Sequence, residues 1–135
     1  MLDTNIVVAG LLWSGKPRRL VDLAFEGKVI LLSSPEMMAE FATVLTRSKF
    51  DRQIAATGGT ISALVRGYLQ LVQLVDPVRL KSIAPDPDDD WVIATAIAAN
   101  ADLIVTGDKP FLSVGEVGHV RIVTGAEALA FLGFE

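Results

Sequence analysis

The sequence lacks cysteine and contains a single histidine, His119. Without cysteine, disulfide bonds and thiolate metal sites are excluded, and one histidine makes a zinc site of the usual kind hard to build. The mostly apolar stretch 92–99 is far shorter than the roughly 20 residues that cross a bilayer. An acid at position 3, with no basic region before it, argues against a signal peptide. We therefore expect a cytoplasmic protein that has no membrane partner.

The chain has fewer basic than acidic residues, and its net charge is −4. Taken alone, this argues against a nucleic-acid partner, because phosphate binders are usually basic. Several of the acids lie in one run, 86–90, and a divalent metal bound there would cancel their charge locally. The length of 135 residues and the hydrophobic content of 51% suit a single domain over residues 1–135 with one sizeable core.

Short apolar runs alternate along the chain with stretches of helical pattern. The apolar runs predict strands at 2–9, 29–32, 74–75, 102–106 and 120–123. Helical spacing, N-caps and prolines at first helical positions predict helices at 16–26, 35–47, 61–73, 90–99 and 126–132. This alternation is typical of the α/β class, and we expect an α/β/α sandwich around a central, mainly parallel sheet.

Acidic residues fall where functional groups gather in such sheets, beyond the carboxyl ends of the strands. Asp3 lies in the expected exit loop of the first strand, and Asp108 follows the strand 102–106 by two residues. The acidic run opens the helix 90–99. The helix 35–47 begins after Ser34, and Glu40 lies at the margin of the apolar stripe on this helix. Carboxylates distant in sequence are therefore expected near one end of one sheet.

A group of neighbouring carboxylates has a chemical consequence. The negative charges repel one another, and a divalent cation relieves that repulsion. Carboxylate oxygens are hard ligands that favour Mg²⁺ or Mn²⁺. Such a metal activates water for attack on phosphorus and stabilises the leaving oxygen. The pattern therefore predicts metal-dependent chemistry at a phosphate ester.

Four short motifs carry most of these residues. They are Leu2-Asp3-Thr4-Asn5, Ser33-Ser34-Pro35-Glu36 through Glu40, Asp86-Pro87-Asp88-Asp89-Asp90 followed by Ala94-Thr95-Ala96, and Val105-Thr106-Gly107-Asp108-Lys109. In this order and spacing they resemble the motifs of the PIN-domain ribonuclease family, particularly its bacterial toxin-like branch. The resemblance extends over essentially the whole chain, and its specificity lies in the combination because no single motif is specific.

The resemblance implies that Asp3, Glu40, Asp89 and Asp108 hold Mg²⁺ or Mn²⁺, with Asn5 as a supporting polar residue. It also implies endonucleolytic cleavage of single-stranded RNA. Many relatives are toxins that dimerise and are silenced by a cognate antitoxin, so a homodimer and an antitoxin partner are implied as well. The remaining acids of the run, Asp86, Asp88 and Asp90, are expected to be helix caps, outer groups or spares.

Two other interpretations stay open. A non-catalytic binding module could keep the fold, because only Met1 and Leu2 precede Asp3 and leave its strand short. A phosphatase-like or receiver-like phosphoryl-transfer domain would also place Asp at strand ends. The phosphatase class needs a second acid two residues after the first, however, and that position is Asn5.

Aromatic and basic residues add weaker signals. Trp13 and Trp91 are expected to pack in the core or at its rim, although Trp13 could stack on a base. The basic residues of 16–19 and of 47–52 could contact phosphates, and a solvated surface is at least an equally good interpretation. We assign His119 a structural place and no catalytic role.

Overall fold

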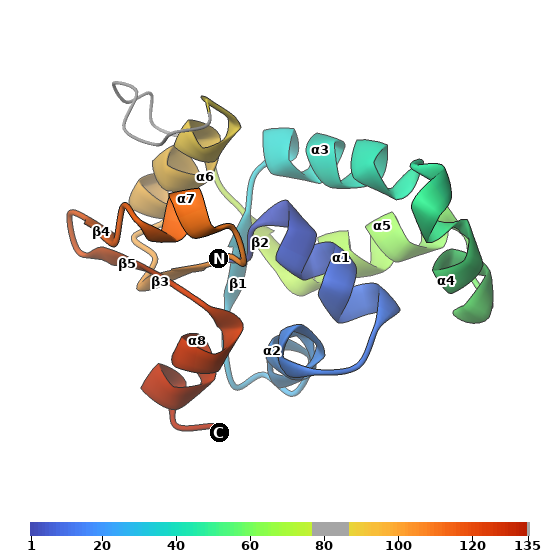
Figure 1. Ribbon diagram of the computed structural model, residues 1–135, viewed down its shortest axis with the longest axis horizontal. Coiled ribbons are helices and arrows are strands. Elements are labelled where there is room, and N and C mark those ends of the chain that lie inside the picture. Colours follow the sequence, from blue (N-terminus) through green and yellow to red (C-terminus); the bar gives the residue numbers. More distant parts are fainter. Residues whose placement is uncertain (77–86, 135) are drawn as a thin grey trace.

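The computed structural model describes residues 1–76 and 87–134, and for residues 87–90 it describes the backbone alone. Of the two small sheets, β1–β2 lies near the centre of the molecule, and β3–β5–β4 extends to its left edge, with helices above and below (Figure 1). The helices are α1 (Thr4–Leu12), α2 (Lys16–Phe25), α3 (Pro35–Leu45), the 3₁₀ helix η1 (Ser48–Phe50), α4 (Asp51–Ala56), α5 (Ile61–Leu71), α6 (Pro87–Ala98), α7 (Lys109–Leu112) and α8 (Gly125–Leu132).

The strands pair mainly in parallel. Strand β1 (Leu31–Ser33) runs parallel to β2 (Val72–Leu74) in one sheet. In the other sheet β3 (Leu103–Val105) runs parallel to β5 (Val120–Val123), and β4 (Glu116–Val117) pairs with β5 in the antiparallel direction. The α/β class with a mainly parallel sheet is therefore confirmed, although the sheets are small.

The first segment of the chain differs from its prediction, because the strand expected over 2–9 is wrong. Leu2 forms only an isolated parallel bridge with Val105, and α1 begins at Thr4. A short apolar run fits a strand and a buried helix equally well, so periodicity does not separate the two. Asp3 decides the outcome, because its side chain accepts a hydrogen bond from the amide of Thr4 at 2.8 Å and caps the helix.

Helix α3 begins as its caps predict. Ser34 accepts a hydrogen bond from the amide of Met37 at 3.2 Å, and Pro35 occupies the first turn. The predicted apolar stripe is buried in full, as Met37, Met38, Phe41, Val44 and Leu45. The inward face of α3 is thereby fixed, and Glu40 lies exposed at the margin of this face.

Other differences concern short or mixed elements. The pieces η1, α4, α7 and β4 are absent from the prediction, because elements of two to six residues carry too little periodicity to be seen. The helix expected over 90–99 begins at Pro87, and it is buried over 92–96 rather than all round, since Trp91 is exposed.

Buried apolar side chains form two clusters. One gathers around α1, α2, α3 and α5, where Phe41 meets Tyr68 edge to face with 5.5 Å between the ring centroids. The other gathers around α6, α7 and the strands β3 and β5, with Ile93, Ile104 and Phe111 fully buried. Among the described helices, none combines the length and apolarity that crossing a bilayer requires.

Met1 is hydrogen-bonded to strand β3 through its backbone. Its ammonium group donates a hydrogen bond to the carbonyl of Leu103 at 3.0 Å, and its carbonyl accepts from the amide of Val105 at 2.8 Å. A pocket of about 520 Å³ opens beside it, between the amino ends of β1 and β3. Burial lowers the pKa of the ammonium group from 8.0 to about 6, against the opposing charge of Asp102.

This lowered pKa predicts a pH-dependent stability. Between pH 6 and pH 8 the unfolded chain binds more protons at Met1 than the folded chain, so folding is favoured as the pH rises. We expect the free energy of unfolding to increase by about 2 kcal/mol from pH 6 to pH 8. Urea denaturation across this range measures it.

The control is the same chain acetylated at Met1, which keeps an N–H donor and cannot be protonated. We expect this control to lose most of the rise in stability, whereas an equal rise in both proteins would contradict the assignment to Met1.

Candidate functional site

Asp3 is held by both of the elements that it joins. Its amide donates a hydrogen bond to the carbonyl of Val105 at 2.9 Å, which ties it to the end of β3. Its carbonyl accepts from the amides of Ile6 and Val7, and its carboxylate accepts from the amide of Thr4. The side chain is 9% exposed. Asp3 is therefore the N-cap of α1 rather than a residue of a strand's exit loop, and the positive end of the helix dipole lies at its carboxylate.

Thr106 connects Asp3 to the segment that follows β3. It is fully buried, and its hydroxyl donates to the second carboxylate oxygen of Asp3 at 2.9 Å. The same hydroxyl oxygen accepts from the amide of Asp108 at 3.1 Å. One side chain thus links segments 103 positions apart. Thr106 belongs to one of the four motifs, but no local pattern in the sequence indicates its role. Only the pairing of Leu2 with Val105 brings its hydroxyl to Asp3.

Asp108 lies at the start of α7, with an exposed side chain. It occupies the N-cap position of this helix, but its carboxylate makes no capping hydrogen bond. Its amide is fixed by Thr106 instead. The structure therefore brings the backbone of Asp108 close to Asp3 and leaves its carboxylate at the surface, where it is accessible to a ligand.

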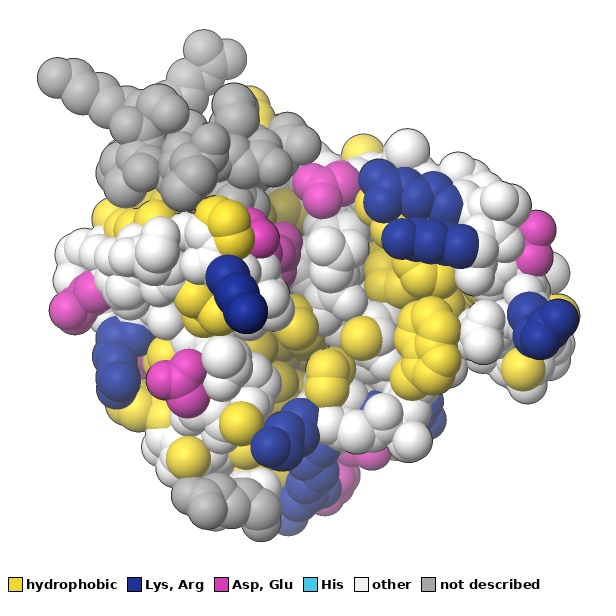
Figure 2. Space-filling model, viewed as in Figure 1, with side chains coloured by type: hydrophobic (Ala, Val, Ile, Leu, Met, Phe, Trp, Pro, Cys, Tyr) yellow, Lys and Arg dark blue, Asp and Glu magenta, His cyan; other side chains and the backbone are white. Residues whose placement is uncertain are grey.

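Glu40 lies on α3. The side chain is exposed, one turn beyond Glu36, while its neighbour Phe41 is buried. Helix α3 packs against α1 and against α6. Asp3 is the N-cap of α1, and Asp89 lies in the first turn of α6. Figure 2 shows acidic side chains on one face of the molecule, between the region of α3 and that of α6 and α7. Glu40 therefore lies on a helix that borders both other acidic segments.

Asp89 lies in the first turn of α6, and its side chain is outside the described residues, as are those of Asp88 and Asp90. Asp86 is outside them altogether. Within the described part of the chain, no group of three acidic or histidine side chains is close enough to hold a metal ion. The link between Asp3 and Asp108 is thus the part of the predicted constellation that the described residues place together.

The donor set that is present suits a hard cation. The carboxylates of Asp3 and Asp108 come from different segments, and Thr106 contacts the carboxylate of Asp3 and the backbone amide of Asp108. Both oxygens of Asp3 accept hydrogen bonds, which orient the group and stabilise its negative charge. Oxygen ligands oriented in this way fit Mg²⁺ or Mn²⁺, and Mg²⁺ needs only one or two carboxylates beside water.

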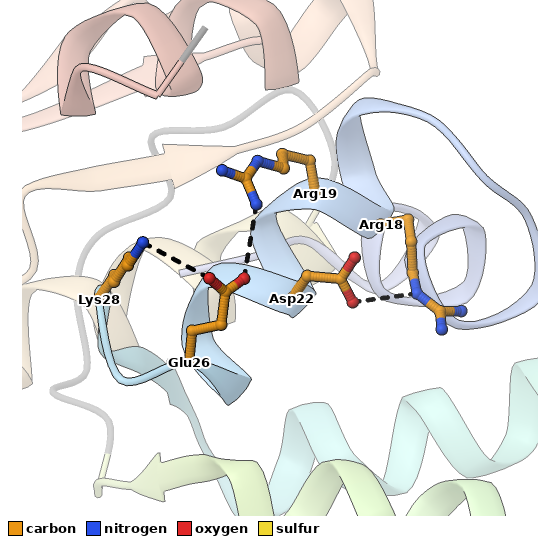
Figure 3. A network of polar contacts seen from close by, with 5 residues as sticks. All are labelled: Arg18, Arg19, Asp22, Glu26 and Lys28. Carbon is orange, nitrogen blue, oxygen red and sulfur yellow. Dashed lines mark hydrogen bonds and ion pairs between the residues drawn. The ribbon is translucent and has the colours of Figure 1, made fainter.

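Both arginines of the first basic cluster, Arg18 and Arg19, pair with acids of α2 or of its C-cap, while no described ion pair involves Lys16. Arg18 pairs with Asp22 at 3.2 Å, and Glu26 accepts from both Arg19 and Lys28 at 3.5 Å (Figure 3). These exposed pairs contribute little to stability, but each acid offsets charge that would otherwise attract phosphate. The structure therefore favours a solvated surface over a phosphate site for the basic residues of α2.

The second basic cluster differs. Arg47, Lys49 and Arg52 are exposed, and no ion pair involves them among the residues that the structure describes. The ammonium of Lys49 lies 5.1 Å from the ring centre of Phe50. His119 is exposed in the turn between β4 and β5, away from the four acidic segments in the chain. The positive charge of Arg47, Lys49 and Arg52 therefore remains available to an anionic ligand.

Comparison with known proteins agrees with this arrangement. The PIN domain matches residues 1–110, a range that includes all four acidic segments. The chain is also similar to an uncharacterized protein of Methanocaldococcus jannaschii, with 26% identity over 115 residues that cover 84% of this chain and 73% of the archaeal protein. No solved structure matches the chain. The match over most of its length shows that the chain belongs to the PIN domain family.

Proposed function

We propose that this protein is a metal-dependent endoribonuclease that hydrolyses phosphodiester bonds of single-stranded RNA. PIN domains are generally nucleases, and this supports the proposal over a phosphatase or receiver. The observation that carries it is the contact of Thr106 with both Asp3 and Asp108. The hydroxyl donates to the carboxylate of Asp3 and so orients it, and it accepts from the backbone amide of Asp108, which places that acid's segment beside Asp3.

In this proposal Asp3, Glu40, Asp89 and Asp108 hold Mg²⁺ or Mn²⁺. The bound metal supplies an activated water and stabilises the leaving oxygen. Asp3 is the most constrained of the four, because the end of β3 and the start of α1 fix its backbone. Thr106 keeps the carboxylate of Asp3 in one orientation and holds the loop of Asp108 against it. Glu40 lies on α3 and Asp89 in the first turn of α6.

The proposal extends to the biological role. A toxin that a cognate antitoxin silences, acting as a homodimer in the cytoplasm, is the role that the motif resemblance implies. The alternative is a PIN-fold module that binds without catalysis. Titration of the protein with Mn²⁺ in a calorimeter separates the two, because the nuclease requires saturable binding that Asp3→Asn weakens.

The direct test is cleavage of a panel of defined single-stranded RNAs by the wild type beside Asp3→Asn. Asparagine is as good an N-cap as aspartate, so α1 should form in the variant. We expect the wild type to cleave with Mg²⁺ or Mn²⁺, and we expect EDTA or the Asp3→Asn substitution to reduce cleavage to background. A thermal melt confirms that the variant folds. Full activity in EDTA, or in folded Asp3→Asn, would refute the proposal.

The acidic run provides a matched pair of variants in one helical turn. Asp89→Asn and Asp90→Asn remove the same charge from neighbouring positions of α6. Because Asp89 is proposed as a ligand and Asp90 is not, we expect cleavage to be lost in the first variant and largely retained in the second. Initial rates at saturating Mn²⁺ measure the difference. Equal losses would show that charge at this helix terminus, rather than ligation by Asp89, is what the reaction needs.

Thr106 is predicted to position the metal ligands. Thr106→Val keeps the shape of the buried side chain but removes its hydrogen bonds to Asp3 and Asp108. We expect the rate to fall about 10- to 100-fold and the Mn²⁺ concentration for half-maximal rate to rise. Thr106→Ser restores the hydroxyl and should recover most of the activity. A valine variant with an unchanged metal requirement would contradict the positioning role.

A further inference from the structure

An exposed stripe on α1 starts beside the candidate site. Asn5 is exposed in the first turn, Ala9 is half-buried one turn later, and Trp13 is exposed at the C-terminal cap. These positions are four residues apart and therefore share one side of the helix. A helix rises about 1.5 Å per residue, so Trp13 lies roughly 15 Å along the axis from Asp3. The outer side of α1 thus connects the acidic end with an exposed indole.

Helix α3 has an equivalent outer stripe. Glu36 and Glu40 are exposed near its start, Thr43 follows on the same side, and Arg47 lies just beyond its end. The two helices pack together and run side by side from the sheet toward η1 and α4 (Figure 1). The α3 stripe has acids near its start and Arg47 beyond its far end, and the α1 stripe runs from the N-cap Asp3 to Trp13.

The far ends of the two stripes meet at an aromatic pair. Trp13 is 43% exposed and packs edge to face on buried Phe50, with 6.1 Å between the ring centroids. Lys49 lies against the same Phe50 ring. Figure 2 shows apolar surface bordered by Lys and Arg side chains toward α4, on the face that also carries the acidic side chains. We call Trp13, Lys49 and Phe50 the aromatic platform.

We propose that the aromatic platform binds a nucleotide of the single-stranded RNA, with the base stacked on Trp13 and a phosphate beside Lys49. Arg47 contributes a second phosphate contact. The inference rests on the proposed function and extends it, since it gives the RNA a path along α1 and α3 from the carboxylates to the platform. Trp13 is a binding residue in this scheme and takes no part in the chemistry.

The residues of the platform suit a nucleotide better than a protein partner. Stacking on an indole uses the flat face that every base has, and the contact tolerates sequence variation. The cations beside the ring are exposed and outside the described ion pairs, whereas Arg18 and Arg19 of α2 pair with Asp22 and Glu26. An aromatic ring flanked by unneutralised cations is the usual composition of a single-strand site.

The test measures RNA binding apart from cleavage. Binding of a short fluorescent single-stranded RNA is titrated in EDTA, and single-turnover cleavage of the same RNA is followed with Mn²⁺. The variants are Trp13→Leu, which keeps apolar bulk without a ring, Trp13→Phe, which keeps a ring, and Lys49→Ala. Phe25→Ala is the matched control, because Phe25 is an exposed aromatic side chain at the end of α2. Thermal melts establish that each variant folds.

We expect Trp13→Leu to weaken binding about tenfold or more, while Trp13→Phe and Phe25→Ala stay close to the wild type. Lys49→Ala should lower the slope of log Kd against log salt by about 0.7. Single-turnover cleavage by Trp13→Leu at subsaturating protein should fall in step with its RNA affinity, about tenfold or more.

Two results would overturn the inference. One is unchanged RNA affinity in folded Trp13→Leu while the wild type still cleaves, which leaves the nuclease intact and removes the platform. The other is loss of binding to a partner protein, rather than to RNA, as the only effect of the Trp13 variants. Binding of RNA that depends on Trp13 in a wild type unable to cleave any RNA would instead support the platform and refute the nuclease.

Discussion

The arrangement of the site depends on how Asp3 is held. Its backbone extends the pairing of Leu2 with the end of β3, and its carboxylate both caps α1 and accepts the hydroxyl proton of Thr106. The contact with Thr4 is local, whereas the contact with Thr106 joins residues 103 positions apart. A hydrogen bond to a charged acceptor contributes about 1.5–3 kcal/mol, so the group is fixed more firmly than a surface acid. The position of α1, and with it the path toward Trp13, follows from this one residue.

Charge is distributed along α1 and α3 in a way that explains how an acidic protein can bind an anion. The net charge is −4, yet acids gather at the starts of α1, α3, α6 and α7, where a cation would neutralise them. Arg18 and Arg19 of α2 pair with Asp22 and Glu26. Those after α3 lie outside the described ion pairs. The local pattern, rather than the sum of charges, therefore decides which surface suits RNA.

Local signals in the sequence account for what could be predicted. Ser34 and Pro35 mark the start of α3 because their chemistry is favourable at those positions in any fold, and residues 120–123 form β5 with the predicted bounds. The α/β class follows from the alternation of such elements. The first segment was missed because its apolar run satisfies a strand and a buried helix alike. Within the candidate site, the acids were visible as residue types, but the role of Thr106 depends on a pairing between distant segments that no local pattern encodes.

The central claim is that carboxylates from separate segments converge on one divalent cation. The most direct measurement is a crystal structure of the protein soaked in Mn²⁺, with anomalous differences used to locate the metal. The account predicts a peak bonded directly to the carboxylate of Asp3 and to at least one of Glu40, Asp89 and Asp108. A well-ordered Asp3 that still accepts the hydroxyl of Thr106, with no Mn²⁺ beside it at saturating concentration, would contradict it.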